Sequence, residues 1–137
     1  MAVIDEIIRL ESDNSLSFGN YSVSEKQKVN DFEASGDVYK VKTHNEITRL
    51  EKNGKLLVET VPGTAIQNLK VSEKNISFSA EGIEDTQVTL ELESDTIYKI
   101  SVDDVSLGKM KANLSGKISF SVGLSSKAKD ILIEKII

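Results

Sequence analysis

The side chains that could carry out chemistry are few in this 137-residue chain. Cysteine is absent, which excludes thiol nucleophiles, thiolate metal sites and disulfides. His44 is the single histidine, so a serine–histidine–carboxylate triad within one chain would need it. It lies in the polar stretch KTHNE, where a solvent-exposed connector between strands is the simpler interpretation. A zinc site is also disfavoured, because zinc prefers several cysteine or histidine ligands.

Carboxylates are plentiful, with 22 aspartates and glutamates in the chain. A glycosidase needs two of them across a cleft, and Glu59 and the Asp103-Asp104 turn are conceivable members. Calcium could take oxygen ligands from Glu84, Asp85 or the same turn, although no EF-hand spacing occurs. Acids in turns also serve local hydrogen bonding alone. We therefore assign no catalytic residue, no metal site and no cofactor. These residue types favour a protein that is not an enzyme over an enzyme.

Motifs for phosphate binding and acyl transfer are missing, since no GxxxxGKS/T, GxGxxG or GxSxG occurs. The net charge is −5, and Arg9 and Arg49 are the only arginines beside 15 lysines. This composition disfavours a nucleic-acid partner, because arginine supplies the planar fork that grips phosphate. No apolar run approaches the roughly 20 residues that span a bilayer, and the acidic N-terminus does not resemble a secretory signal. We expect no membrane partner and a cytoplasmic location, or an extracellular one if the chain is a processed form.

A sugar-binding face usually offers aromatic platforms beside polar groups, but aromatic residues make up only 5% of this chain and tryptophan is absent. The alternating apolar pattern assigns Phe78, Phe120 and Tyr98 to the core. Tyr39, in GDVYKVKTH, is the best candidate for an exposed platform, although a buried tyrosine bonded through its hydroxyl is the more common case. Tyr39 and His44 are therefore the candidate ligand-binding residues.

Alternating apolar and polar residues dominate the second half of the chain, in residues 76–80, 88–92, 98–102 and 118–124. Such alternation is typical of antiparallel sheets with one buried and one solvent-facing side. Turn-forming residues separate the runs at the spacing expected for a sandwich or barrel, and we count seven candidate strands in residues 69–136. The predicted fold is all-β and antiparallel, with an immunoglobulin- or fibronectin-like β-sandwich in the second half.

The clearest local signal in the first half is the hairpin EITRLEKNGKLLVETVPG. Its Asn53-Gly54 pair supplies both positive-φ positions of a type I′ turn. Pro62 ends the second strand or lies at a sheet edge, because it has no N–H to donate. We place a soft boundary after this hairpin, which gives two sheet-rich lobes: a hairpin-rich lobe of residues 1–65 and a sandwich lobe of residues 66–137.

Other parts of the first half are ambiguous. The first ten residues fit either helical spacing or a strand, and alternation predicts strands near residues 16–18 and 21–23. Ser22 and Glu25 form a weak capping box, which allows a single helical turn before Phe32.

The C-terminal stretch KDILIEKII is nearly continuous in apolar residues, and we favour a final strand with Ile131 and Ile133 inward over a helix. An outer strand would normally alternate, so either both faces are buried within one chain or a neighbouring chain covers one. In the second case Ile131, Ile133 and Ile136 line the contact. Residues 56–58, which are all apolar, mark a second surface that a partner could cover, because adjacent residues cannot all face one core. We expect a homo-oligomer, and we also consider another protein or a glycan as the partner.

The run LSFGNYSVSEKQKVNDFEASGDVYKVKTHNEITRLEKNGKLLVETVPGTAIQNL, followed by DTQVTLELESDTIYKISVDDVSLGKMKANLSGKISFSVGL, resembles a family of short bacterial all-β proteins of unassigned function, whose members are sometimes labelled endosialidase. The resemblance covers nearly the whole chain. The label implies a glycan-acting protein, and sialidases clamp a carboxylate with clustered arginines beside a tyrosine–glutamate pair. Arg9 and Arg49 are well separated and match no such motif, so no catalytic residue is carried over. The stretch TIYKISVDDVSLGKMKANLSGKISFSV resembles accessory β-sandwich modules of carbohydrate-active enzymes.

The leading functional hypothesis is a non-catalytic β-sandwich protein that acts through self-assembly or protein–protein interaction. Its physical basis is the combination of apolar terminal strands with the absence of a catalytic constellation. The alternative is a carbohydrate-binding module or a glycan-acting, endosialidase-like protein. A filament subunit is a variant of the first hypothesis in which the assembly does not close.

Overall fold

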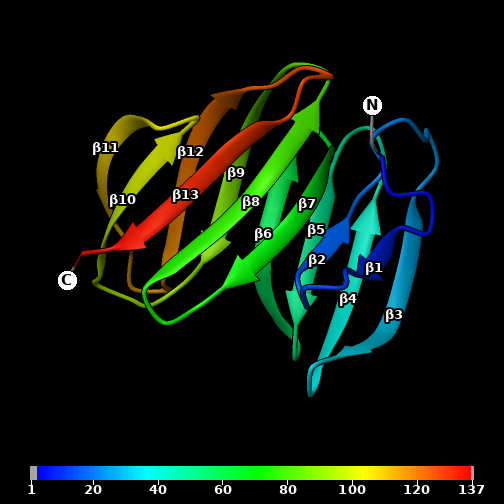
Figure 1. The fold of residues 1–137 in the computed structure, drawn as a ribbon, viewed down its shortest axis with the longest axis horizontal. Helices are drawn as coiled ribbons and strands as arrows, with labels where there is room; N and C mark the ends of the chain where they lie inside the picture. The colour runs from blue at the N-terminus through cyan, green and yellow to red at the C-terminus, as the bar shows by residue number, and fades with distance from the viewer. Residues whose placement is uncertain (1–2, 137) are drawn as a thin grey trace.

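The computed structural model describes residues 3–136, which form two antiparallel sheets packed face to face (Figure 1). No helix occurs in this range, so the prediction of an all-β, antiparallel fold is confirmed, while the immunoglobulin- or fibronectin-like detail stays a prediction. The described range accordingly holds no helix of the length and apolar character needed to cross a membrane.

Sheet A has seven strands in the order β1-β2-β7-β8-β13-β10-β11, and each strand is antiparallel to its neighbours. The strands are β1 (Ile8–Leu10), β2 (Leu16–Phe18), β7 (Thr64–Val71), β8 (Asn75–Gly82), β13 (Lys129–Lys135), β10 (Ile97–Val102) and β11 (Val105–Lys111).

Sheet B has six strands in the order β12-β9-β6-β5-β4-β3. The strands are β12 (Lys117–Gly123), β9 (Asp85–Glu91), β6 (Lys55–Val61), β5 (Thr48–Lys52), β4 (Asp37–Thr43) and β3 (Gln27–Ala34). Strands β7 to β13 confirm the seven strands expected in the second part of the chain.

One hydrophobic core fills the space between the sheets, because alternate side chains of most strands turn inward. Sheet A and sheet B both contribute side chains that are at most 1% exposed. The larger apolar ones are Phe18, Ile66, Ile100, Ile131 and Ile133 from sheet A, and Val41, Leu50, Val58, Val88 and Leu90 from sheet B. Burying an aliphatic side chain of this size stabilises a fold by about 1.5–3 kcal/mol, so this core dominates the stability.

The two halves of the chain occupy opposite ends of the sandwich but share its sheets and core (Figure 1, blue to cyan at the right, yellow to red at the left). The boundary placed at residue 65 falls inside β7. In sheet A β2 pairs with β7, and in sheet B β6 pairs with β9. Strand pairing and packing are thus continuous across the boundary between residues 1–65 and 66–137, and the division into two lobes stays a prediction.

Two-residue turns close three of the hairpins. In each turn both residues have positive φ, as a type I′ turn requires, and the prediction at Asn53-Gly54 is confirmed. The turns are Ser35-Gly36 between β3 and β4, Asn53-Gly54 between β5 and β6, and Asp103-Asp104 between β10 and β11. Strand β6 ends directly before Pro62, as expected for a residue that lacks an N–H.

Strand β3 is the main element that the sequence patterns did not indicate. A helical turn was allowed before Phe32 and a strand was expected near residues 21–23, but residues 21–25 form a turn and a bend, and β3 follows them. It is the edge strand of sheet B and is exposed along most of its length, so its sequence lacks apolar alternation. Its pairing with β4 is also irregular between Val29 and Phe32.

A β-bulge explains the three adjacent apolar residues of β6. Leu56, Leu57 and Val58 are 9%, 8% and 0% exposed, so all three are buried within the chain. The pairing of β5 with β6 shifts register, so that Leu50 lies opposite Val58 while Glu51 lies opposite Leu56. Leu57 is the extra residue of the bulge and joins the core together with Val58. No partner is needed to cover these residues, which corrects the expectation drawn from strict alternation.

Asp13, in the connection between β1 and β2, links the edge of sheet A to Lys70 of β7. Its carboxylate accepts hydrogen bonds from the hydroxyl and the backbone N–H of Ser15, and lies 3.2 Å from Nζ of Lys70. These interactions, those of Ser15 first, lower the pKa of Asp13 from 3.8 to about 2. A carboxyl group whose pKa is lower in the folded state stabilises the fold above its ordinary pKa, and that contribution is lost as the pH falls through the folded value.

We therefore expect Asp13→Asn to lower the midpoint of thermal unfolding near neutral pH. The difference from the wild type should shrink as the pH is lowered from about 4 to about 2, because the wild-type carboxyl then becomes protonated as well. Circular dichroism during heating at a series of pH values measures both quantities. The control is Asp5→Asn, at an exposed position. A difference between Asp13→Asn and the wild type that stayed constant down to about pH 2 would contradict this role of Asp13.

Candidate functional site

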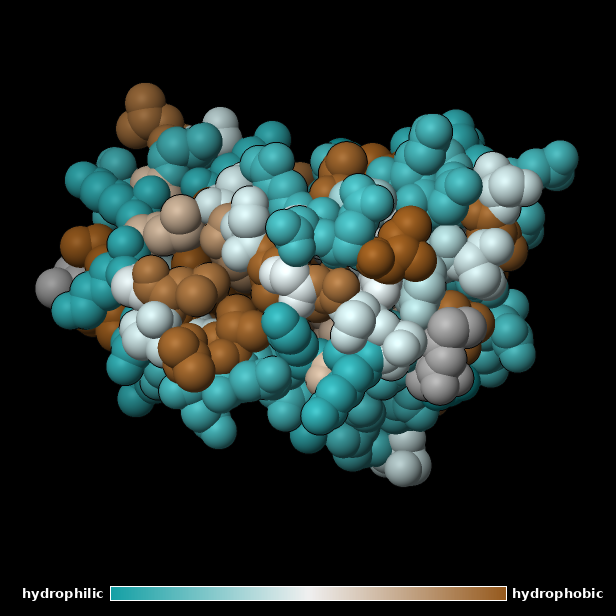
Figure 2. Space-filling view, turned by 90° about the horizontal axis from the view of Figure 1, so that it is seen from above, coloured by the Kyte–Doolittle hydropathy of each residue, from teal (hydrophilic) through white to brown (hydrophobic). Residues whose placement is uncertain are grey.

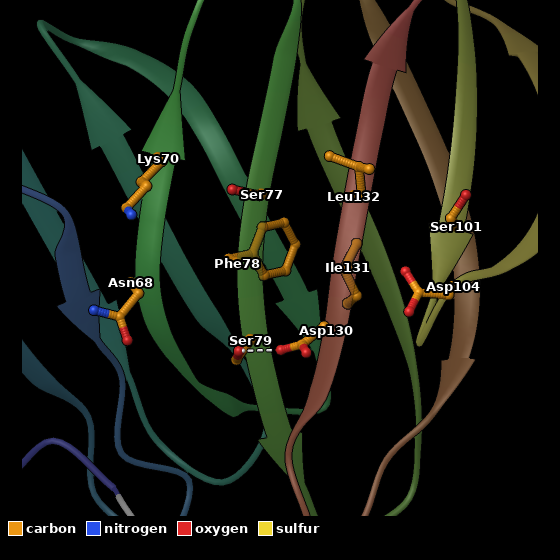
Figure 3. Close-up of a pocket in the computed structure, with 10 residues that line it drawn as sticks. All are labelled: Asn68, Lys70, Ser77, Phe78, Ser79, Ser101, Asp104, Asp130, Ile131 and Leu132. Carbon is orange, nitrogen blue, oxygen red and sulfur yellow. Dashed lines mark hydrogen bonds between the residues drawn. The ribbon is translucent and has the colours of Figure 1, made fainter.

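A shallow groove crosses the outer face of sheet A over β7, β8, β13 and β10 (Figure 3). Its volume is about 330 Å³. The residues that line it are Asn68, Lys70, Ser77, Phe78, Ser79, Ser101, Asp104, Asp130, Ile131 and Leu132. Phe78 and Ile131 are core residues, buried on the other face of the sheet. The accessible side chains of the groove are therefore polar, with Leu132 as the exception.

Strand register places four of these side chains in one row across the sheet. Ser77 of β8 lies opposite Lys70 of β7 on one side and opposite Leu132 of β13 on the other. Leu132 in turn lies opposite Ser101 of β10. Neighbouring strands are about 4.8 Å apart, so Ser77 and Ser101 stand about 10 Å from each other with Leu132 between them. The row therefore has one serine hydroxyl on each side of the apolar side chain of Leu132.

A bulge in β7 builds one rim of the groove. The register between β7 and β8 shifts between Gln67 and Lys70, and Asn68 has a left-handed conformation with a φ of 56°. The bulge keeps Leu69 in the core while Asn68 and Lys70 line the outer face. The backbone N–H of Asn68 donates to Oγ of Ser17 at 3.1 Å, which fixes the bulge against β2.

The opposite side of the groove is fixed by hydrogen bonds around Asp130. Oγ of Ser79 donates to Oδ1 of Asp130 at 2.6 Å, and the backbone N–H of Asp130 donates to Oδ1 of Asp103 at 2.8 Å. The Asp103-Asp104 turn is thereby tied to β13, and Asp104 lines the groove. This turn was considered as a glycosidase or calcium position, and in the structure the carboxylate of Asp103 accepts a hydrogen bond from the backbone of β13.

The hydrogen bonds of the groove do not form an arrangement for nucleophilic catalysis. Ser79 bonds to a carboxylate rather than to a histidine or lysine base, and Lys70 is paired with Asp13. Among residues 3–136, no group of three or more histidines, aspartates or glutamates is arranged to hold a metal ion.

A buried polar cluster lies on the same face, farther along β8. The Tyr21 hydroxyl donates to Oε2 of Glu81 at 2.9 Å, and Nε2 of Gln67 donates to Oε1 of Glu81 at 3.2 Å. Tyr21 is 5% exposed and Glu81 is 2% exposed. The sequence held no signal for this cluster, because Tyr21 and Glu81 are 60 positions apart and neither belongs to a motif. Burial, and then the hydrogen bond to Glu81, raises the pKa of Tyr21 to about 12.

The Tyr21–Glu81 pair has the residue types of the sialidase pair but not the surroundings. Glu81 is an adjacent base for the Tyr21 hydroxyl, but both side chains are buried and the pKa of Tyr21 is raised. Arg9 pairs with two glutamates beside β1, and Arg49 pairs with Glu59 and a neighbouring glutamate in sheet B. Neither arginine joins the cluster. Glu59, one of the conceivable glycosidase acids, is held by Arg49 in the other sheet.

The structure does not bring the two predicted ligand-binding residues together. Tyr39 lies in β4, is 8% exposed and belongs to the core, and its burial raises its pKa. It is therefore not the exposed platform that was considered. His44 follows the end of β4, about 16 Å along the strand from Tyr39. Nδ1 of His44 is buried without a hydrogen-bond partner among the described residues, and neither residue lines the groove.

The predicted interface residues separate into two groups. Ile131 and Ile133 are each 1% exposed and pack in the core of their own chain, so the expectation of an inward-facing final strand is confirmed. Their assignment to an interface is wrong, because β13 lies in the middle of sheet A with its inner face covered by sheet B. Ile136 is 42% exposed, lies beyond the end of β13, and is the one of the three that a partner could reach.

Comparison with known proteins finds no matching family model, no matching curated protein and no matching solved structure. The interpretation of the site therefore depends on its own residues.

We expect Tyr21→Phe to destabilise the fold by about 1–3 kcal/mol, because the buried Glu81 carboxyl loses the hydroxyl donor. Urea unfolding followed by fluorescence or circular dichroism measures the change. Tyr39→Phe is the matched control, since the Tyr39 hydroxyl has no hydrogen-bond partner within residues 3–136, and it should change stability by less than about 0.5 kcal/mol. Equal effects of the two substitutions would show that the Tyr21–Glu81 hydrogen bond is not important for stability.

Proposed function

We propose that the protein is a non-catalytic β-sandwich that functions by self-association, through contacts between opposite ends of the sandwich. The observation that carries the proposal is the exposure of strand β11. All seven of its residues are exposed, including Val105 at 65%, Leu107 at 52% and Met110 at 36%. We call the end of the molecule formed by β10, β11 and β12 the open end.

The apolar side chains of β11 stand where a facing strand is missing. Met110 lies opposite Tyr98 of β10, and Val105 lies opposite Val102, and both of these partners pack against the core. Directly opposed residues share a face, so Met110 and Val105 lie on the core-facing side of sheet A. Sheet A has seven strands and sheet B has six. Sheet B ends at β12, which leaves β11 at the end of sheet A without a strand opposite it. Hydrophobic side chains gather at this end of the surface (Figure 2, left).

Charge favours a contact between unlike ends over pairing of two open ends. Residues 105–117 carry three lysines, Lys109, Lys111 and Lys117, and no acidic residue. Two open ends would bring these lysines together, and a bulge at Leu107 further disturbs the edge of β11. The opposite edge of sheet A is β1, and residues 5–13 around it carry four acids and one arginine.

A second copy that places its β1 edge against the open end would match these charges and cover the apolar side chains of β11. Leu10 of β1, which is 41% exposed, supplies an apolar side chain at that edge. Such a contact joins different surfaces of the two copies and is heterologous. Repeated, it produces a ring or a chain, and the assembly becomes weaker as salt screens the charges.

We expect the wild-type protein to increase in mean mass with concentration and to dissociate at high salt, as measured by light scattering and sedimentation velocity. Leu107→Asp should weaken association at least about tenfold, equivalent to about 1.4 kcal/mol, because it places a charge in the apolar contact. The control is Val38→Asp, at a strand position that is 40% exposed on β4 of sheet B. A wild-type protein that stays monomeric at high concentration and low salt would overturn the proposal.

Mixing two variants, each of which carries a new charge at one end of the sandwich, distinguishes contacts between unlike ends from contacts between like ends. Leu107→Asp retains the β1 edge, and Leu10→Asp retains the open end. We expect each variant alone to be monomeric and their mixture to form dimers that do not extend. Dimers of Leu10→Asp alone would show instead that two open ends pair.

A further inference from the structure

We propose that the groove on the outer face of sheet A is a binding site for a neutral oligosaccharide. The proposal concerns the outer face of the sheet, whereas the proposed self-association uses the ends, so the two can fail separately. It depends on three features of the groove: an apolar centre, hydroxyls free to form hydrogen bonds, and carboxylate and amide oxygens around them.

The apolar centre is Leu132, which is partly exposed in the floor of the groove. A sugar ring carries C–H groups on its faces and hydroxyl groups around its edge. Leu132 can contact a ring face while Ser77 and Ser101, on either side of it, meet the hydroxyls at the ring edge. Figure 3 shows these three side chains in line across β8, β13 and β10.

The hydroxyls of the row are available to a ligand. Ser77 and Ser101 are partly exposed, and within the described part of the chain neither hydroxyl has a hydrogen-bond partner. Ser79, in contrast, already donates to Asp130. A serine hydroxyl both donates and accepts, as a sugar hydroxyl does, so each free serine can form hydrogen bonds in either direction.

Acceptor oxygens complete the site. Oδ1 of Asp130 accepts from Ser79, which leaves Oδ2 directed to no partner in residues 3–136, and Asp104 lines the groove beside it. Nδ2 of Asn68 donates to Oγ of Ser15 at 3.0 Å, so its carbonyl oxygen remains available on the other rim. Carboxylates accept hydrogen bonds from sugar hydroxyls but repel anions, so the two aspartates favour a neutral sugar over a phosphate or an acidic sugar.

The experiment is a titration of the isotope-labelled full chain with cellohexaose, xylohexaose, mannohexaose and maltohexaose, followed by backbone amide NMR spectra. Binding by at least one of these sugars should shift amides of β8, β10 and β13 around Ser77, Ser101 and Leu132. The double variant Ser77→Ala/Ser101→Ala should weaken that binding about tenfold through loss of two hydrogen bonds. The same titration of Leu107→Asp should give unchanged affinity, which separates this site from self-association.

The control is Ser119→Ala/Ser121→Ala, which removes two serine hydroxyls from outward positions of β12 in sheet B, one of them hydrogen-bonded to Thr89, and should leave the affinity unchanged. Shifts that lie outside the groove, or equal weakening by both double variants, would overturn the proposal. The absence of shifts with all four sugars would also overturn it. Tighter binding of a lysine-rich peptide, lost at high salt, would show that Asp104 and Asp130 serve a basic protein segment instead.

Discussion

The contact between the inner apolar faces of the two sheets is the interaction on which the rest of the molecule depends. A buried aliphatic side chain contributes about 1.5–3 kcal/mol, whereas an exposed ion pair contributes about 0–1 kcal/mol. The core therefore determines which side of each strand faces inward, and Ile131 and Ile133 of β13 show the result most clearly. Apart from the buried Tyr21–Glu81 cluster, the outer face of sheet A carries mainly exposed or partly exposed polar side chains, which contribute less to stability than the core.

Two departures from a regular sandwich follow from the way the strands pair. The bulge in β7 turns Asn68 and Lys70 to the same outer face, and a pair of short serines between longer rims makes that face concave. The unequal strand numbers of the sheets leave β11 without a strand opposite it. The groove thus arises from irregular pairing within sheet A, and the open end arises from the extra strand of that sheet.

Much of the fold could be predicted from alternation and turn chemistry, because strands β8, β9, β10, β12 and β13 bury one face and Asn53-Gly54 dictates its turn. Strand β3 could not, because an exposed edge strand needs no apolar residues. The site was not predictable either. Ser77, Leu132 and Ser101 form a row only through the register of three strands, which no local pattern specifies. An apolar C-terminal run was equally compatible with an interface and with a strand inside the sheet, and the strand order places it inside.

A shallow, open groove with few hydrogen-bonding groups binds weakly, because only the surplus over lost translational and rotational freedom appears as affinity. The proposed self-association would change this limit. Copies joined from the β1 edge to the open end would bring the sheets A of successive molecules next to each other, and each copy would carry one groove. A repetitive polymer could then occupy several grooves at once, and linked sites raise the overall affinity by about 10²–10⁴ without any new contact. If both proposals hold, the weak groove and the uncovered strand edge would together supply the two elements that a multivalent polysaccharide-binding assembly requires.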